Sequence, residues 1–153
     1  FGGDNDDYKG DLRNDVPHGK GTKKFANGNI YEGDWKNGFM EGKGIITFAD
    51  GAKYDGEMKD NQKHGKGIYI HADGKKFIGE FKNDMKNGNG TLTSANGDEY
   101  TGNFKDELFD GKGHCGGTIG AVIYLNKFED TLKIMTWLGG ESNWQPCDRV
   151  PAL

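Results

Sequence analysis

The chain has 153 residues, a formal net charge of −4 and a calculated isoelectric point near 5.5, so it lacks the strong basic excess of a nucleic-acid-binding protein. Only 33% of its residues are hydrophobic and its mean hydropathy is −0.86, a composition that by itself is typical of disordered chains. Its longest apolar run, residues 120–125, is far shorter than the ~20 residues of a membrane-spanning helix.

Cysteine usage and the start of the chain bear on its compartment. Cys115 and Cys147 are too few for a disulfide scaffold, and we expect free thiols in a reducing environment. The absence of a signal-peptide pattern favours a cytoplasmic location. The chain does not begin with Met, which favours a fragment or a processed product of a longer protein.

A regular repeat argues against disorder. An aromatic residue followed two positions later by glycine recurs every 23 residues, beginning at Tyr8, Tyr31, Tyr54, Phe77 and Tyr100. Repetition at a fixed period of 20–50 residues is the signature of stacked structural units. We therefore predict five copies of one unit, in a fold that usually presents a long surface to a partner.

The second copy indicates how each unit folds. Over residues 30–35, aromatic residues and glycine alternate with charged residues, which is the period-two pattern of a half-buried strand. Residues 37–42 predict a tight connection and residues 43–48 a second strand. Asp50-Gly51 then predicts a turn into the next copy.

The turn between copies recurs as Asn27-Gly28, Asp50-Gly51, Asp73-Gly74 and Asn96-Gly97. Such pairs are strong hairpin signals, and we expect positive φ at both central residues. Each copy is then a β-hairpin, and successive hairpins are joined by further tight turns. We predict an all-β fold, an elongated single-sheet antiparallel meander or solenoid of about ten strands.

Two columns of side chains are predicted to form the core. The first ring column is Tyr8, Tyr31, Tyr54, Phe77 and Tyr100, and the second ring column is Leu12, Trp35, Met58, Phe81 and Phe104. Glycines beside them would let the rings lie flat on neighbouring backbone. Phe25 and Phe48 extend the seam, whereas the equivalent later positions hold His71 and Ser94, so we expect a thinner seam there.

The segment from Tyr31 to Gly44 resembles the MORN repeat (membrane occupation and recognition nexus), with a Tyr-x-Gly-x-aromatic opening, a turn and a Gly-x-Gly close. All five copies share this pattern, although Leu12 and Met58 replace the second aromatic residue and Phe77 replaces Tyr. The resemblance covers residues 8–113. It divides them into repeats 8–30, 31–53, 54–76, 77–99 and an incomplete 100–113, after a flank of residues 1–7.

The resemblance implies a non-catalytic interaction module. Members of the family act as scaffolds at membranes and the cytoskeleton, often as homodimers or beside a separate enzyme domain. For this chain the resemblance implies protein partners that are cytoskeletal or membrane-associated, a homodimer as one assembly, and a location at either structure.

Residues 114–153 depart from the repeat and are predicted to cap the open end of the sheet, since an uncovered terminal repeat exposes a strand edge. Docking a partner is the alternative role. A degenerate sixth opening lies at residues 124–128. Residues 119–138 fit either strands or a helix, with strands favoured, and residues 139–151 are expected to be irregular.

No set of side chains predicts an enzyme, a metal site or a cofactor. His18 and His64 would lie ~19 Å apart, too far to share a metal ion. An outward column of carboxylates is spaced by ~10 Å, too widely for a retaining glycosidase pair. That column is Asp11, Asp34, Glu57 and Glu80. We expect it to pair with the flanking basic column of Arg13, Lys36, Lys59, Lys82 and Lys105.

Two surfaces are candidates for binding. The first is a groove lined by rings and glycines for a partner segment: Tyr8, Tyr31, Trp35, Phe48, Tyr54, Met58, Phe77, Phe81, Tyr100 and Phe104. The alternative for these residues is a purely structural core. The second is a pair of basic ladders for an acidic partner or anionic lipid: Arg13, Lys36, Lys59, Lys82 and Lys105, with Lys20, Lys43, Lys66 and Lys112. Interleaved carboxylates favour a solvated face instead.

These observations predict a protein–protein interaction scaffold. The alternatives are weak peripheral binding to anionic lipid and a regulatory module of a larger enzyme of the lipid kinase or lysine methyltransferase type. A glycan-binding solenoid is disfavoured by the Gly-x-Gly spacing and by the lack of a secretory signal.

Overall fold

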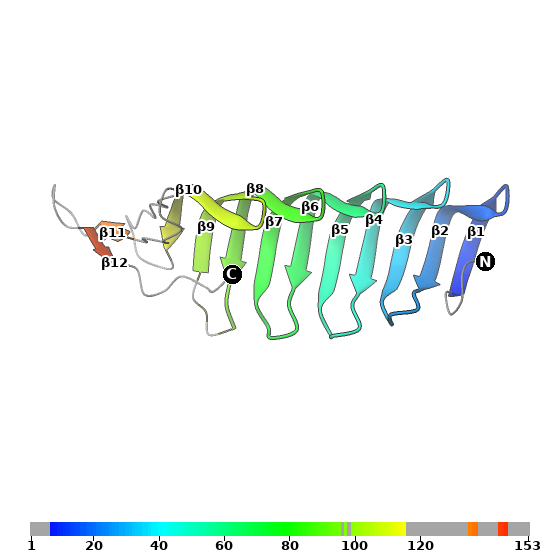
Figure 1. The fold of residues 1–153 in the computed structure, drawn as a ribbon, viewed down its shortest axis with the longest axis horizontal. Helices are drawn as coiled ribbons and strands as arrows, with labels where there is room; N and C mark the ends of the chain where they lie inside the picture. The colour runs from blue at the N-terminus through cyan, green and yellow to red at the C-terminus, as the bar shows by residue number, and fades with distance from the viewer. Residues whose placement is uncertain (1–6, 96, 98, 116–134, 138–143, 147–153) are drawn as a thin grey trace. The chain divides into compact units, whose positions relative to one another are not determined.

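The structure is a computed structural model that describes residues 7–95, 97, 99–115, 135–137 and 144–146, with side chains described as far as Leu108 (Figure 1). The strands are β1 Asp7–Arg13, β2 Val16–Lys24, β3 Ile30–Lys36, β4 Phe39–Thr47, β5 Lys53–Lys59, β6 Gln62–Ile70, β7 Lys76–Lys82, β8 Met85–Thr93, β9 Glu99–Lys105, β10 Leu108–Cys115, β11 Met135–Trp137 and β12 Trp144–Pro146.

The prediction of an all-β antiparallel meander is confirmed. Strands β1 to β10 follow one another in the sheet in the order of the sequence, and the sheet does not close. The chain divides into two compact units, which are described separately. The first consists of residues 1–72 with 81–84, and the second of residues 73–80 with 85–153.

Within each repeat the two strands are joined by a two-residue turn. Asn37 and Gly38 both have positive φ, 51° and 86°, as a type I′ turn requires. β4 therefore begins at Phe39, and the prediction that residues 37–42 form the connection is wrong. Asp60 and Asn61 make the same turn with φ of 49° and 66°, because Asx side chains tolerate this conformation.

The turns between repeats differ from the prediction as well. After Phe25 the chain makes a three-residue loop in which the N–H of Gly28 donates to the Phe25 carbonyl at 3.0 Å. The N–H of Phe25 donates to the Asn29 carbonyl at 2.8 Å, which closes the loop. Gly28 has a φ of 94°, whereas Asn27 is not among the residues with positive φ. The expectation of two positive φ values is wrong here, because a type I turn followed by one left-handed glycine makes the connection.

The two-residue turns of the second to fifth repeats also bind the preceding repeat. In the first unit, the N–H of Met40 donates to Asn61 Oδ1 at 2.8 Å and the N–H of Asn61 donates back to the Met40 carbonyl at 3.1 Å. In the second unit, Lys86 and Glu107 repeat this exchange at 2.8 and 3.0 Å. These bonds lie outside the sheet ladder, so they attach successive hairpins a second time.

A line of paired glycines crosses the strands. In the first unit Gly33 faces Gly21 on β2 and Gly44 on β4. A Cβ atom at Gly44 would lie 2.3 Å from the Tyr31 ring, which leaves no room for any side chain. Figure 1 shows the strands bending where they approach the two-residue turns. The glycine line therefore provides the space in which each ring lies against the neighbouring strand.

The rings form an edge-to-face core. Trp35 meets Tyr31 of its own repeat at 5.1 Å between ring centroids and Tyr8 of the preceding repeat at 5.5 Å, with interplanar angles of 88° and 86°. In the second unit Phe104 contacts Tyr100 and Phe77 in the same way, at 5.2 and 5.0 Å. Edge-to-face contacts at these distances are favourable for aromatic pairs. The predicted core seam thus consists of rings linked from one repeat to the next.

The C-terminal prediction lies largely outside the described residues. Met135–Trp137 is a strand, in agreement with the favoured alternative for that part of residues 119–138. Trp144–Pro146 pairs with it antiparallel, which contradicts the expected irregular course there. Residues 116–134, and with them the degenerate sixth opening, are not described.

Candidate functional site

The two faces of the sheet differ in accessibility. We call the side that carries both ring columns the ring face, and the other side the polar face. Eight of the ten candidate groove residues on the ring face are buried: Tyr31, Trp35, Tyr54, Met58, Phe77, Phe81, Tyr100 and Phe104. Tyr8 and Phe48 are half-buried. This burial supports the alternative interpretation that the columns form a structural core.

The tyrosine hydroxyls are used internally. Tyr31 donates to the carbonyl of Asp34 at 2.8 Å, and Tyr54 donates to that of Glu57 at 2.7 Å. Burial, and secondarily the nearby Asp34 carboxylate, raises the pKa of Tyr31. Burial followed by Glu57 does the same to the pKa of Tyr54. These hydroxyls therefore stay protonated and act as fixed donors to the backbone.

Two lysines also lie on the ring face, and neither was predicted there from the sequence. The Lys63 ammonium lies 5.0 Å from the Tyr69 ring centroid and 5.8 Å from that of Phe81. Lys86 is buried, with its ammonium 3.0 Å from Glu107 Oε2 and 5.6 Å from the Phe77 ring centroid. The sequence did hold a signal for this placement. Lys63 and Lys86 occupy the position in their repeats that Met40 occupies in the second repeat, on the same face.

On the polar face, the carboxylate column is bonded mainly to backbone. Asp34 Oδ2 accepts the N–H of Lys43 at 3.1 Å, and Asp34 Oδ1 accepts from the Lys20 ammonium. Equivalent bonds run from the N–H groups of Lys20, Lys66 and Asn89 to Asp11, Glu57 and Glu80, at 3.1, 2.6 and 3.0 Å respectively. Each bond follows a glycine with positive φ, such as Gly42 at 102°.

The ion pair of Asp34 corrects the expected pairing. Its partner is Lys20, from the second ladder, rather than Lys36 from the flanking column. The hydrogen bond from Lys20 is the largest cause that lowers the pKa of the Asp34 carboxyl, followed by that from the Lys43 N–H, while burial opposes them. The carboxylate column thus stabilises the irregular register at each hairpin instead of forming an array of simple surface ion pairs.

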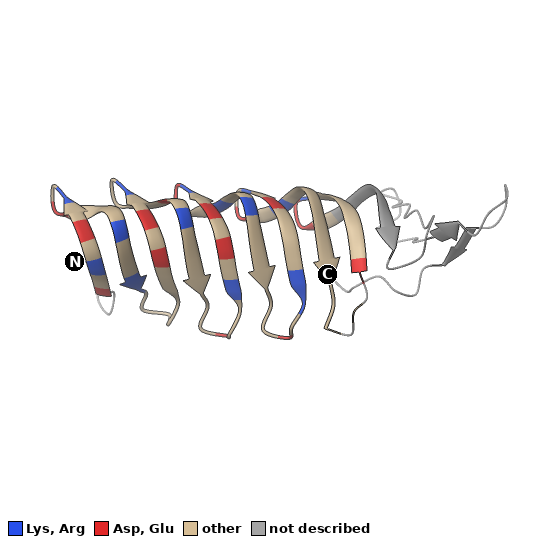
Figure 2. Cartoon of the chain, turned by 180° about the vertical axis from the view of Figure 1, so that it is seen from behind, with Lys and Arg blue, Asp and Glu red and all other residues tan. Residues whose placement is uncertain are grey.

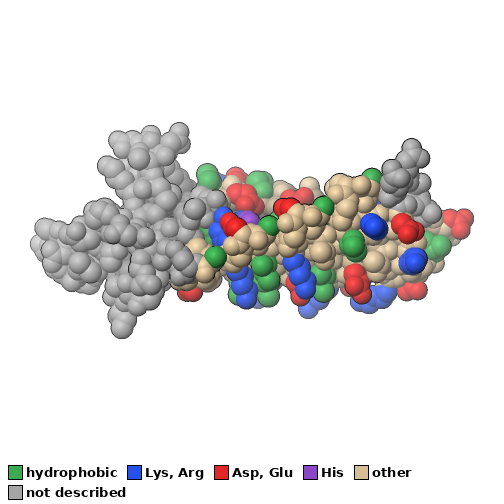
Figure 3. Space-filling view, turned by 90° about the horizontal axis from the view of Figure 1, so that it is seen from below, with side chains coloured by type: hydrophobic (Ala, Val, Ile, Leu, Met, Phe, Trp, Pro, Cys, Tyr) green, Lys and Arg blue, Asp and Glu red, His purple; other side chains and the backbone are tan. Residues whose placement is uncertain are grey.

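The basic ladders are exposed. Lys112 lies beyond the described side chains, and the other eight members are all exposed: Arg13, Lys20, Lys36, Lys43, Lys59, Lys66, Lys82 and Lys105. In Figure 2 acidic residues gather on β3 and β5, with basic residues on the strands beside them. Figure 3 shows hydrophobic, basic and acidic side chains interspersed on the face that it views.

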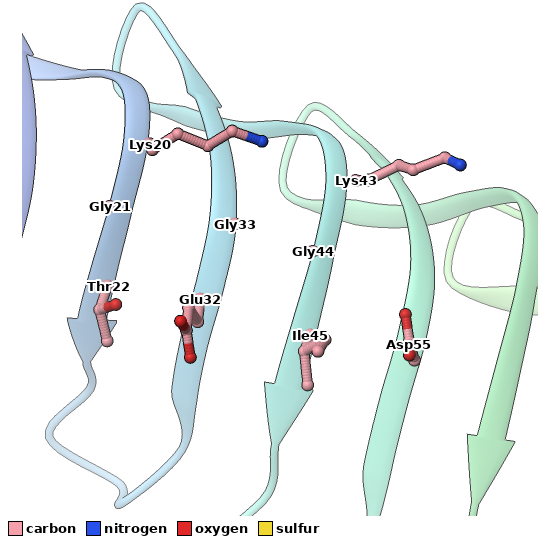
Figure 4. Close-up of a pocket in the computed structure, with 9 residues that line it drawn as sticks. All are labelled: Lys20, Gly21, Thr22, Glu32, Gly33, Lys43, Gly44, Ile45 and Asp55. Carbon is pink, nitrogen blue, oxygen red and sulfur yellow. The ribbon is translucent and has the colours of Figure 1, made fainter.

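An open groove of about 540 Å³ lies on the first unit, across β2 to β5. Its lining residues are Lys20, Gly21, Thr22, Glu32, Gly33, Lys43, Gly44, Ile45 and Asp55. Figure 4 shows the two lysines on one side of the glycine line and Thr22, Glu32, Ile45 and Asp55 on the other. Lys20 and Lys43 were candidates from the sequence, whereas the four residues opposite them were not. Their alternation with the ring columns was the signal that placed them on the polar face.

The described side chains offer little for catalysis. Among them, no group of three or more His, Cys, Asp and Glu residues is placed to hold a metal ion. His18 has a structural role, since its Nδ1 accepts the N–H of Asn37 at 3.2 Å. In the same part of the chain, no helix has the length and apolar character needed to cross a bilayer.

The sequence of the repeats matches a known family. The family model for the MORN repeat matches residues 8–30, 31–53, 54–76, 77–99 and 100–122. The chain belongs to the MORN-repeat family. MORN repeats are non-catalytic modules that in general bind other molecules. The fifth matched MORN repeat extends to residue 122, whereas the sequence pattern supports it only to residue 113. No curated protein matches the chain.

Proposed function

We propose that this MORN-repeat chain is a non-catalytic interaction module that binds an extended segment of a partner protein on its polar face. The groove on β2 to β5 carries this proposal, because it combines a floor free of side chains with charged residues along both sides. The burial of the ring columns supports the same choice of face. A partner seated on the ring face would have to displace packed rings.

The spacing of the lysines indicates which segment fits. Lys20 and Lys43 hold equivalent positions on β2 and β4, two strands apart, so their backbones are separated by ~9.6 Å. A polyproline II segment advances ~3.1 Å per residue with three residues per turn, so every third side chain lies on the same side, ~9.3 Å from the last. A segment with a carboxylate at every third position would meet Lys43 and would compete with Asp34 for Lys20.

The opposite side of the groove sets a second requirement. Glu32 and Asp55 lie there, with Ile45 between them and Thr22 on the other side of Glu32. Carboxylates on this side favour basic or hydrogen-bond-donating side chains in the partner, and Ile45 offers an apolar contact. The proposed ligand is therefore a mixed-charge extended segment, acidic along one edge and basic along the other.

Selection from a random peptide library displayed against the full chain tests this proposal. Enriched peptides are expected to carry acidic residues three apart, and Lys43→Glu should weaken their binding by at least about tenfold, because it replaces an attraction with a repulsion. Lys24→Glu is the matched control, an exposed lysine that lies outside the groove. Failure to enrich any peptide, or equal binding by the Lys43→Glu variant, would contradict the proposal.

A second candidate function is binding to anionic lipid. Its support is Phe39, which is 47% exposed and pairs across the hairpin with Lys36. Lys36 belongs to the basic ladder whose neighbouring members, Arg13 and Lys59, are also exposed. Exposed rings beside lysines favour the interface of an anionic bilayer. Co-sedimentation with phosphatidylserine vesicles at low and high salt tests this, with Phe39→Ala and Lys36→Glu expected to reduce the bound fraction. Binding that does not depend on anionic lipid or salt would exclude it.

A further inference from the structure

The lysines beside the glycine line differ in whether they already have a partner. Lys20 on β2 lies opposite Asp34 of β3 and forms an ion pair with it. Lys43 on β4 and Lys66 on β6 hold the equivalent positions and are exposed. Within the described side chains, neither of them takes part in an ion pair. Two lysines that are two strands apart are therefore available to a ligand, while the one on β2 is occupied.

The row of side chains opposite the lysines differs in the same direction. Ile45 on β4 pairs with Asp55 on β5, and Asp55 pairs with Ile68 on β6. Both isoleucines are half-buried. At the equivalent position of β2 the chain has Thr22. Apolar contacts are thus offered by β4 and β6, the same strands that carry the two available lysines.

The floor between the two rows continues to β6. Gly44 pairs with Gly56, and Gly56 pairs with Gly67, so no side chain separates the rows on these strands. Figure 4 shows Lys43 and Ile45 on opposite sides of Gly44. They are two residues apart on one strand, which sets the rows ~6.8 Å from each other. A single extended chain can therefore lie on the glycines and touch both rows.

We infer, on the basis of the proposed function, that the partner segment is a polyproline II helix of acidic–apolar–proline repeats, anchored over β4 to β6 by Lys43 and Lys66. With three residues per turn, one edge of such a helix presents an acidic side chain every ~9.3 Å, and a second edge presents an apolar one. β4 and β6 are two strands apart, ~9.6 Å, so successive acidic side chains reach the two lysines and successive apolar ones reach Ile45 and Ile68. Each proline restricts the residue before it to extended backbone, which lowers the entropy lost on binding.

Asp34 determines the register of the segment. At Lys20 a carboxylate of the segment has to displace Asp34, and exchanging one carboxylate for another gains little. At Lys43 and Lys66 it displaces no ion pair. A longer segment continues over β2 but gains no anchor there. Opposite the lysines only Asp55 remains charged, so the basic edge of the proposed ligand narrows to a single hydrogen-bond donor.

Fluorescence anisotropy of a labelled nonapeptide with three Glu-Leu-Pro repeats, titrated with the full chain, tests the inference. Lys43→Ala and Lys66→Ala should each weaken binding about three- to fivefold, the loss expected for an exposed ion pair. Lys20→Ala is the matched control and should change the affinity by less than about twofold, because Asp34 already occupies that lysine. Ile68→Thr, which gives β6 the residue type of β2, should weaken binding about fivefold.

Asp34→Asn provides a second, opposite test. The variant keeps an acceptor for the Lys43 N–H but releases the Lys20 ammonium to the third glutamate of the peptide. Binding should therefore strengthen about three- to fivefold, and Lys20→Ala in the same chain should remove this gain.

Weaker binding with Lys20→Ala but not with Lys66→Ala would overturn the inference and leave the proposed function intact, because Lys20 lines the groove and Lys66 does not. A nonapeptide that does not bind, or that binds no better than a scrambled peptide of the same composition, would overturn it as well. Failure of the proposed function is seen separately, in a display selection that enriches no peptide.

Discussion

The hydroxyl groups of the first ring column matter more than the rings' burial alone suggests. Tyr8, Tyr31, Tyr54 and Tyr100 each donate to the backbone carbonyl three residues later, at 2.6 to 3.0 Å. In the hairpins of Tyr31 and Tyr54, the register shift between the two strands spans the residue that carries this carbonyl. A side-chain donor at this place therefore stabilises a backbone group next to the irregularity.

Tyr54→Phe is expected to lower the free energy of unfolding by about 1 kcal/mol, because it leaves the part-buried Glu57 carbonyl without its donor beneath a fully buried ring. Tyr8→Phe should cost less than half as much, since Tyr8 is half-buried and water can replace its hydroxyl. Urea unfolding of the three proteins measures both. Equal costs for the two substitutions would contradict a role for burial.

Asp34 makes stability depend on acid pH. Its folded-state pKa is lowered, chiefly by the Lys20 hydrogen bond, so its contribution is complete above the unfolded pKa of ~3.9 and is lost as the pH falls through the folded value. Asp34→Asn keeps an acceptor for the Lys43 N–H but removes the charge. The variant should be slightly less stable at pH 7, and the difference should vanish as the pH falls below ~4. Urea unfolding from pH 7 to pH 3 checks this, and a difference that grows toward acid pH would contradict it.

At the scale of the hairpin, the glycines have two different structural roles. Gly44 leaves room for a ring, whereas Gly51 takes a backbone conformation with a φ of 97°, and a Cβ atom added to it would meet nothing within 4 Å. Gly44→Ala should therefore destabilise the protein by about 3 kcal/mol through its clash with Tyr31. Gly51→Ala should cost only about 1 kcal/mol from backbone strain. Thermal unfolding distinguishes them, and a tolerated Gly44→Ala would contradict the close packing of ring on backbone.

The hairpins could be predicted from the sequence because ring, glycine and charge alternate with a period of two over residues such as 30–35. The positions of the turns could not be predicted equally well. Asn37-Gly38 and Asp50-Gly51 look alike as sequence, yet the first makes a two-residue turn and the second belongs to a three-residue loop. The two turns differ in the pairing of the strands that they join, since the register shifts between Gly33 and Trp35 in the hairpin closed by Asn37-Gly38. That shift depends on contacts between strands.

Part of the candidate site could be predicted from the same alternation of side chains along each strand. Alternation places the ring columns on one face and Lys20 and Lys43 on the other, but it cannot say whether a face is open. The rings are closed over because a ring such as that of Tyr31 lies on a glycine of the next strand, and a ring such as that of Tyr8 lies against Trp35 of the next repeat. Lys63 and Lys86 were missed because the predicted core was built from the aromatic and apolar columns alone, and a charged residue at a ring-face position gives no such pattern.

At the scale of the molecule, one arrangement recurs in both units. It consists of a pair of rings, the edge of one ring lying over paired glycines, and a carboxylate bonded to the backbone nine residues later. It occurs in the first unit around Tyr31 and in the second around Phe77. The interior side of each repeat is thereby occupied by its own rings. The groove on β2 to β5 lies on the polar face, which is where the proposed function places recognition.

Intermolecular nuclear Overhauser effects between the labelled chain and a selected peptide test this assignment of faces most directly. We predict contacts from the methyl groups of Ile45 and Thr22 to the peptide, with the ring protons of Trp35 and Phe81 showing none. Contacts from those ring protons, with none from Ile45, would show that the ring face opens to bind and would contradict this assignment.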